Sequence, residues 1–190
     1  MAEREILLLG NPLLYRVSSA VEPEDLAEMA AVVADLRDTL LAFRGRYGAG
    51  RAIAAPQIGV RKRLVYVHLE GTTSAHLAEG PMVLLNPQFT WRSDEMMTVW
   101  DDCMCFPDLL VRVLRHRACR LEYRDLEWRP RVWDLEGDLS ELLQHECDHL
   151  DGVLAVSRAV DGRSFALRSQ SHLVVPEPPP AGPKPLQGQP

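Results

Sequence analysis

The segment His145-Glu146-Cys147-Asp148-His149 constrains this chain more than any other, because it sets two histidines four residues apart. On an α-helix, residues i and i+4 lie on one face, one turn apart, so both imidazoles can reach a single metal ion. The carboxylate of Glu146 follows the first histidine and can accept a proton from water at such a metal. The segment therefore predicts a buried helix that carries two metal ligands and a general base.

The flanking residues predict where this helix begins and ends. Asp138 and Glu141 have the spacing of an N-cap and its capping-box partner, and Gly152 suits a left-handed cap at the other end. The apolar stripe consists of Leu139, Leu142, Leu143 and Leu150. This stripe would press the helix into a core. Two ordinary histidines are the alternative, but a buried imidazole pair without a metal would need other hydrogen-bond partners.

A catalytic metal site usually takes three protein ligands and leaves one position for water. The spacing H-E-x-x-H-x-x-G-x-x-H would place a third histidine at residue 155, which is Ala155, and the downstream Glu177 lies in a proline-rich stretch. An upstream ligand remains, and Cys103 is the candidate. Cys105 is the alternative, because alternation along a strand would point both thiols to one face.

Three segments of the chain, in order, resemble the motifs of the peptide deformylase family, G-x-G-x-A-A-x-Q, E-G-C-L-S and Q-H-E-x-D-H-L. The counterparts are GRAIAAPQ at residues 50–57, DDCMC at residues 101–105 and QHECDHL at residues 144–150. The third segment matches at every fixed position. The resemblance covers roughly residues 4 to 160, and three motifs in the right order are a specific signal.

The resemblance implies three ligands of a divalent metal: Cys103, His145 and His149. In that family the metal is typically iron(II), with zinc, nickel or cobalt as substitutes, and thiolate and imidazole ligands suit all of them. Glu146 would take up a proton from water and pass it to the departing amine. Gln57 and the backbone N–H of Met104 would donate hydrogen bonds to the oxygen that gains negative charge.

The resemblance also implies that the first motif binds the substrate peptide as an added strand. The predicted substrate-binding residues are Gly50, Arg51, Ala52, Ile53, Cys105 and Phe106. A second set is predicted to hold the metal ligands in place from behind, namely Gln144, Asp101 and Arg115. Arg112 is the alternative partner of Asp101.

Four positions depart from the family motifs. Ala52 replaces the second glycine, Asp101 the glutamate, Asp102 the glycine before the ligand, and Cys105 the serine. None of them removes a predicted ligand, the base or the oxyanion donor, so they bear on substrate fit and efficiency. The methyl group of Ala52 would narrow the cleft or disfavour a conformation that glycine adopts freely.

The order of patterns predicts an α+β fold like that of the deformylases, with short, mainly antiparallel sheets around a central metal-binding helix and an N-terminal helix. The N-terminal helix is expected over residues 24–43, and strands over residues 63–69, 82–91, 109–114 and 119–123. A weak helical pattern covers residues 161–173. Residues 1–172 are predicted to form the catalytic domain, and residues 173–190 a proline-rich, disordered tail.

Charge and composition limit the partners. The formal net charge of −6 argues against a nucleic-acid binder with a broad basic surface. A local basic cluster of Arg112, Arg115, Arg117 and Arg120 is predicted to be the solvent face of a strand, with docking to ribosomal RNA as the alternative. No apolar run approaches the roughly 20 residues needed to cross a membrane. Four cysteines without a secretory leader favour a reducing cytoplasm.

The predicted function is metal-dependent hydrolysis that removes the N-formyl group from the N-terminal methionine of newly synthesised proteins. The expected partners are N-formylmethionyl nascent peptides, with a transient ribosome contact and neither DNA nor membrane. The alternative is a diverged relative that hydrolyses another N-acyl amide, or a non-catalytic metal-containing binding protein. The departures at Ala52, Asp102 and Cys105 are the support for that alternative.

Overall fold

The computed structural model describes residues 2–73 and 80–174. Its two α-helices are α1 (Leu26–Tyr47) and α2 (Asp138–Leu150). Its strands are β1 (Ala52–Ala54), β2 (Leu64–Val67), β3 (Met82–Arg92), β4 (Met96–Asp102), β5 (Leu109–His116), β6 (Ala118–Arg124), β7 (Pro130–Glu136) and β8 (Phe165–Leu167). The predicted α+β class is confirmed. Within the described ranges, no helix is long and apolar enough to span a bilayer.

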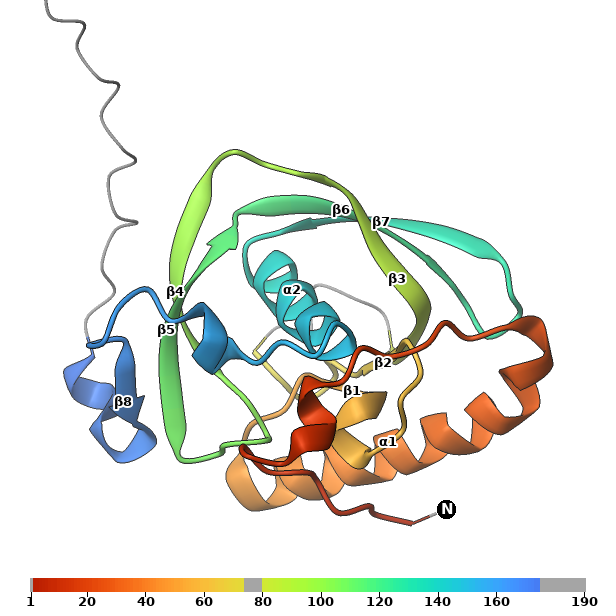
Figure 1. Cartoon of the computed structure of the whole chain (residues 1–190), viewed down its shortest axis with the longest axis horizontal. Helices are drawn as coiled ribbons and strands as arrows, with labels where there is room; N and C mark the ends of the chain where they lie inside the picture. Colours follow the sequence, from red (N-terminus) through yellow and green to blue (C-terminus); the bar gives the residue numbers. More distant parts are fainter. Residues whose placement is uncertain (1, 74–79, 175–190) are drawn as a thin grey trace, which may run out of the picture.

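The strands form two antiparallel sheets with α2 between them. One sheet has five strands in the order β1-β2-β3-β6-β7, and the other has three in the order β4-β5-β8. Figure 1 shows α2 beneath the arch of β3, β6 and β7, with β4 and β5 at one side and α1 running past β1 and β2. The helix that carries the histidines is therefore enclosed by strands, as predicted.

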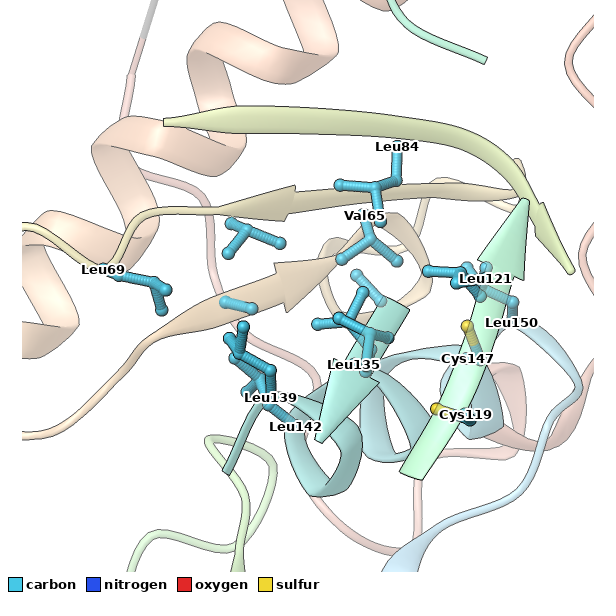
Figure 2. Close-up of a cluster of buried hydrophobic side chains, with 14 residues drawn as sticks. Val65, Leu69, Leu84, Cys119, Leu121, Leu135, Leu139, Leu142, Cys147 and Leu150 are labelled. Carbon is cyan, nitrogen blue, oxygen red and sulfur yellow. The ribbon is translucent and has the colours of Figure 1, made fainter. Parts of the chain in front are cut away.

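The first two strands of the larger sheet are buried on both faces. Side chains of successive strand residues point to opposite faces. Ala54 and Val65 join the cluster between α2 and the larger sheet, together with Leu143 and Cys147, and Figure 2 shows this cluster. Ile53 and Tyr66, which alternate with them, pack toward α1 in a second cluster. Each fully buried leucine contributes roughly 1.5–3 kcal/mol, so packing on both faces fixes where α2 lies.

The N-terminus of α2 differs from the prediction. Its N-cap is Gly137, which has φ 54° and no side chain to cap the helix, and Asp138 is the first helical residue. The Glu141 side chain instead forms an ion pair of 2.7 Å with Arg51. The predicted capping box is therefore wrong, although both carboxylates still lie in the first turn, where the helix dipole favours them. The predicted left-handed glycine is confirmed, because Gly152 has φ 71° directly after the C-cap.

Other boundaries also differ. The N-terminal helix begins at Leu26, after a 3-10 turn at Pro23–Asp25, and continues to Tyr47. The sequence patterns missed four strands: β1, β4, β7 and β8. The helix predicted over residues 161–173 is wrong, because β8 pairs with the edge of β5 and the 3-10 helix Arg168–Leu173 follows. Of the proline-rich tail, residues 175–190 lie outside the described residues, and the domain boundary stays a prediction.

The basic cluster is not a single solvent face. Arg112 and Arg115 are buried, and each has a carboxylate partner, Asp161 for Arg112 and Asp101 for Arg115. Alternation along β5 turns Arg115 inward. There, the attraction between Arg115 and Asp101 offsets the cost of burying both charges. The predicted solvent face is therefore wrong for these two residues, and of the four arginines only Arg117 and Arg120 are exposed.

Candidate active site

Three buried donor atoms from two parts of the chain converge beside α2. The Sγ of Cys103 lies 3.3 Å from the Nε2 of His149, which lies 3.1 Å from the Nε2 of His145. The three donors lie within 4.8 Å of one another. The two histidines are one turn apart on α2, and Cys103 directly follows β4. One thiol and two imidazoles are a donor set that suits zinc, iron or nickel.

The unsatisfied polar atoms fit a metal at this place. Two imidazole nitrogens that face each other can share only one proton, whereas a metal ion would engage both lone pairs. Burial and the neighbouring His145 hold the pKa of His149 well below its usual range, so His149 is neutral, the form that binds metals. The Oε2 atom of Glu146 is buried without a hydrogen-bond partner in the described part of the chain.

A network of charged side chains lies on the Nδ1 side of His145. Its Nδ1 lies 2.9 Å from one oxygen of Asp101, whose other oxygen lies 2.7 Å from Arg115. Arg115 also contacts Asp148 at 2.5 Å, and Asp148 accepts two hydrogen bonds of 2.6 Å from the half-exposed Arg158. Arg115, not Arg112, is thus the arginine that pairs with Asp101. Such partners fix the orientation of a metal-binding imidazole.

The network changes the charge states of its members. Burial alone would raise the pKa of Asp101, but His145 and Arg115 outweigh it and lower that pKa to about 2. Burial would likewise lower the pKa of His145, but the Asp101 carboxylate raises it to about 10. Both shifts describe the same attraction, so Asp101 stays ionised and places a negative charge 2.9 Å from Nδ1 of His145.

Glu146 and Gln57 line the same pocket as Cys103 and His145. Burial raises the pKa of Glu146 to about 7, close to the value that suits a group that both takes and returns a proton. The side-chain oxygen of Gln57 accepts a hydrogen bond of 2.7 Å from the backbone N–H of Ala54. This bond turns its amide nitrogen toward the thiols of Cys103, at 3.8 Å, and Cys105, at 3.6 Å.

The pocket has a void of about 50 Å³. The predicted site residues on its wall are Gly50, Arg51, Ala52, Gln57, Asp101, Cys103, Met104, His145 and Glu146. Ile53, Cys105 and Phe106 are buried in hydrophobic clusters instead, and their predicted role in substrate binding stays a prediction.

The two small residues before β1 have different backbone requirements. Gly50 has φ +122°, and a Cβ there would lie 3.1 Å from the side chain of Leu40, so this position requires glycine. Ala52 is the first residue of β1 and pairs with Val67 in an extended conformation. Its methyl group is therefore no conformational obstacle, and the departure from the family motif acts only on the shape of the pocket wall.

Gln144 lies against the end of β5, its predicted role in supporting the metal ligands stays a prediction, and sequence analysis missed Arg168. Gln144 accepts a hydrogen bond from the backbone N–H of His116 and donates one to its carbonyl, so it ties α2 to the end of β5. Arg168, from the segment after β8, lines the pocket. No motif marks this arginine, and its partner Asp102 lies 66 positions away in the sequence. The departure at Asp102 was the only available signal.

A model of the polypeptide deformylase family matches residues 3–164. This chain belongs to that family. Peptide deformylase 1 of Prochlorococcus marinus (strain MIT 9313) is 37% identical over 176 residues, which are 90% of this chain and 88% of the relative. The peptide deformylase of Leptospira biflexa serovar Patoc (strain Patoc 1 / Ames) is 34% identical over 170 residues, 87% of this chain and 92% of the relative. The resemblance noted in the motifs is confirmed.

Solved deformylase structures share the fold. A Synechococcus elongatus deformylase in complex with actinonin has a TM-score of 0.73 at 27% identity, covering 84% of this chain and 80% of the other. An Acinetobacter baumannii deformylase bound to Met-Ala-Ser has a TM-score of 0.74 at 25% identity, covering 83% and 98%. Deformylase-family membership implies a divalent metal, and the cluster of Cys103, His145 and His149 is a possible site for it.

Proposed function

We propose that this chain is a peptide deformylase that removes the formyl group from the N-terminal methionine of newly synthesised proteins, releasing formate and a free amine. The observation that carries the proposal is the convergence of Cys103, His145 and His149, in a chain of this family. Cys103 and His145 line a pocket together with Glu146 and Gln57. The Acinetobacter relative bound to Met-Ala-Ser, a peptide that begins with methionine, supports this substrate class.

Cys103, His145 and His149 would hold the metal, which we propose to be iron(II), with zinc, nickel or cobalt as substitutes. When bound, the metal supplies a Lewis acid that lowers the pKa of water and polarises the formyl carbonyl. A thiolate with two imidazoles supports this choice over magnesium or calcium, which prefer oxygen ligands. Asp101 would keep the ring of His145 in the orientation that presents Nε2.

The protein groups in the pocket would move the protons and stabilise the developing charge. Glu146 takes the proton from the attacking water and later gives it to the amine nitrogen as the bond between carbon and nitrogen breaks. The amide nitrogen of Gln57 and the backbone N–H of Met104 donate hydrogen bonds to the carbonyl oxygen as it gains negative charge. The water oxygen stays on the carbon, and formate leaves.

The substrate peptide would lie along β1. This strand is the edge of the five-stranded sheet, so one side of its backbone can pair with an added strand. Gly50, Arg51 and Ala52, at and before the start of β1, line the pocket next to that edge. An extended peptide there would direct its formylated end toward Glu146.

Cytoplasmic location and a transient ribosome contact belong to the same proposal, because the substrate is an emerging chain. The exposed arginines of the former basic cluster have acidic neighbours: Arg117 lies 3.5 Å from Glu95, and Arg120 lies 2.7 Å from Asp134. These pairs do not form a broad basic surface, so the ribosome contact stays a prediction without support from this cluster.

The test is formate release from a formyl-Met-Ala-Ser peptide by protein purified without oxygen and loaded with iron(II) or nickel. We expect Glu146→Gln, which keeps the shape of the side chain, to lower turnover by about 10²- to 10⁴-fold while metal content stays near that of the wild type. Glu136→Gln, at an exposed glutamate on β7, is the matched control. A folded, metal-loaded wild type without turnover would refute the proposal and favour another N-acyl amide or a binding role.

A further inference from the structure

The end of the described chain brings an arginine to the rim of the active-site pocket. Arg168 directly follows β8 and lines the same pocket as Cys103 and Glu146. The match to the deformylase family model ends at residue 164, so β8 and Arg168 lie beyond the matched region. In Figure 1, β8 and the turn after it stand beside β5 at the left of the molecule. This arginine is thus a feature of the chain that the family match does not include.

Three contacts hold Arg168 in one place, one from its backbone and two from its guanidinium. Its backbone N–H donates to the carbonyl of Asp108 at 2.8 Å, and its Nε donates to the carbonyl of Pro107 at 2.6 Å. Its Nη2 lies 2.8 Å from a carboxylate oxygen of Asp102. A free arginine loses rotamer entropy when it is ordered, and these contacts offset that cost before any substrate binds.

Asp102 stands where the resemblance to the family motif predicts a glycine. Its carboxylate is the only acid among the three contacts, so it neutralises the charge of Arg168. The two side chains are 40% and 37% exposed, which places the pair at the mouth of the pocket rather than in its interior. A guanidinium has five N–H donors, and within the described residues the Nη1 group has no partner. The pair therefore offers a directed hydrogen-bond donor without a net positive charge.

The size of the pocket indicates which part of a substrate peptide would contact Arg168. A void of about 50 Å³ has room for a few water molecules, or for the reacting end of a peptide. The residues after the first must leave across the rim, where Arg168 stands. Because Asp102 neutralises the guanidinium, the donor suits an uncharged acceptor, and every peptide offers a backbone carbonyl.

We propose that Arg168 is a specificity-determining residue that donates a hydrogen bond to a backbone carbonyl of the substrate beyond its first residue, and that Asp102 positions it. This inference rests on the proposed deformylase function. It predicts that the contribution of Arg168 depends on peptide length, because a substrate that ends at methionine cannot reach it.

The test compares two uncharged substrates, formyl-Met-Ala-Ser amide and formyl-methionine amide, in wild type and Arg168→Gln. We expect kcat/KM for the longer substrate to fall about tenfold, mainly through KM, and kcat/KM for the shorter to change less than about twofold. The ratio of the two values within one preparation is independent of any inactive fraction. Arg163→Gln, at an exposed arginine of the same segment, should leave the ratio unchanged.

Each result has a distinct meaning. An equal loss on both substrates would assign Arg168 a purely structural role and overturn the inference, as would no change on either. Asp102→Asn, which keeps a hydrogen-bond acceptor but removes the charge, should lower the ratio in the same direction as Arg168→Gln. Wild-type protein that turns over neither substrate would overturn the proposed function instead.

Discussion

At the scale of single residues, two cysteines two positions apart have different surroundings. Cys103 has its Sγ 3.3 Å from the Nε2 of His149 and belongs to the group of donors that could hold a metal. Cys105 shares a hydrophobic cluster with Cys103 and also lies near the amide nitrogen of Gln57, at 3.6 Å, but it is not among those donors. β4 ends before both residues, so the strand alternation that left either thiol possible does not apply.

This difference predicts that replacement by serine has opposite effects on metal content at the two cysteines. Cys103→Ser should reduce bound metal to background, because a neutral hydroxyl is a poor replacement for a thiolate. Cys105→Ser should retain about one metal per chain, because it restores the residue of the family motif and replaces none of the three candidate ligands. Metal analysis after gel filtration measures both. Retention by Cys103→Ser with loss from Cys105→Ser would show that Cys105 is the ligand.

At the scale of elements, the end of α2 is fixed by a close approach of two backbones. A Cβ at Gly152 would lie 2.7 Å from the carbonyl carbon and oxygen of Tyr15, and φ there is +71°. Gly152→Ala should therefore destabilise the protein by about 2 kcal/mol or more, and lower Tm. Gly45→Ala, inside α1 with nothing within 4 Å of a Cβ, should stabilise it by about 0.5–1 kcal/mol. Equal shifts in Tm would contradict this account.

The helices and strands also show which parts of the fold the sequence could predict. The ligand helix was predictable because the spacing of His145 and His149 is a local consequence of helix geometry. β7 was missed because it begins with Pro130 and is mostly exposed, as an edge strand can be. β8, three residues long, has no pattern of its own and exists through its pairing with β5. The residues that it pairs with are 54 or more positions away, beyond any local pattern.

The candidate site also contains residues that the sequence could predict and residues that it could not. Motif residues such as Gln57 and Glu146 could be named from the sequence because their neighbours along the chain mark them. Ion pairs across the fold, such as Arg51 with Glu141 and Arg168 with Asp102, leave no local signal because either partner also suits a solvated surface. The structure is needed to bring such pairs together.

At the scale of the whole molecule, the three candidate ligands join separate parts of the fold. Cys103 belongs to the segment after β4, whereas His145 and His149 belong to α2, which packs under the larger sheet. Asp101 connects the two parts by contacting both His145 and Arg115. A metal that binds only this folded arrangement must stabilise the entire domain, since the unfolded chain does not present the three donors together.

The thermal shift produced by nickel should therefore depend on Asp101. Loss of a carboxylate behind a metal-binding histidine weakens metal affinity by about 10- to 100-fold, so Asp101→Asn should reduce the stabilisation by added metal by about 1.4–2.7 kcal/mol. The variant also leaves the buried Arg115 with Asp148 as its acidic partner, which lowers Tm of the metal-free protein. The difference between Tm with and without nickel separates the two effects. Asp134→Asn, at an exposed aspartate, is the control, and an equal nickel shift in both variants would show that Asp101 does not act through the metal site.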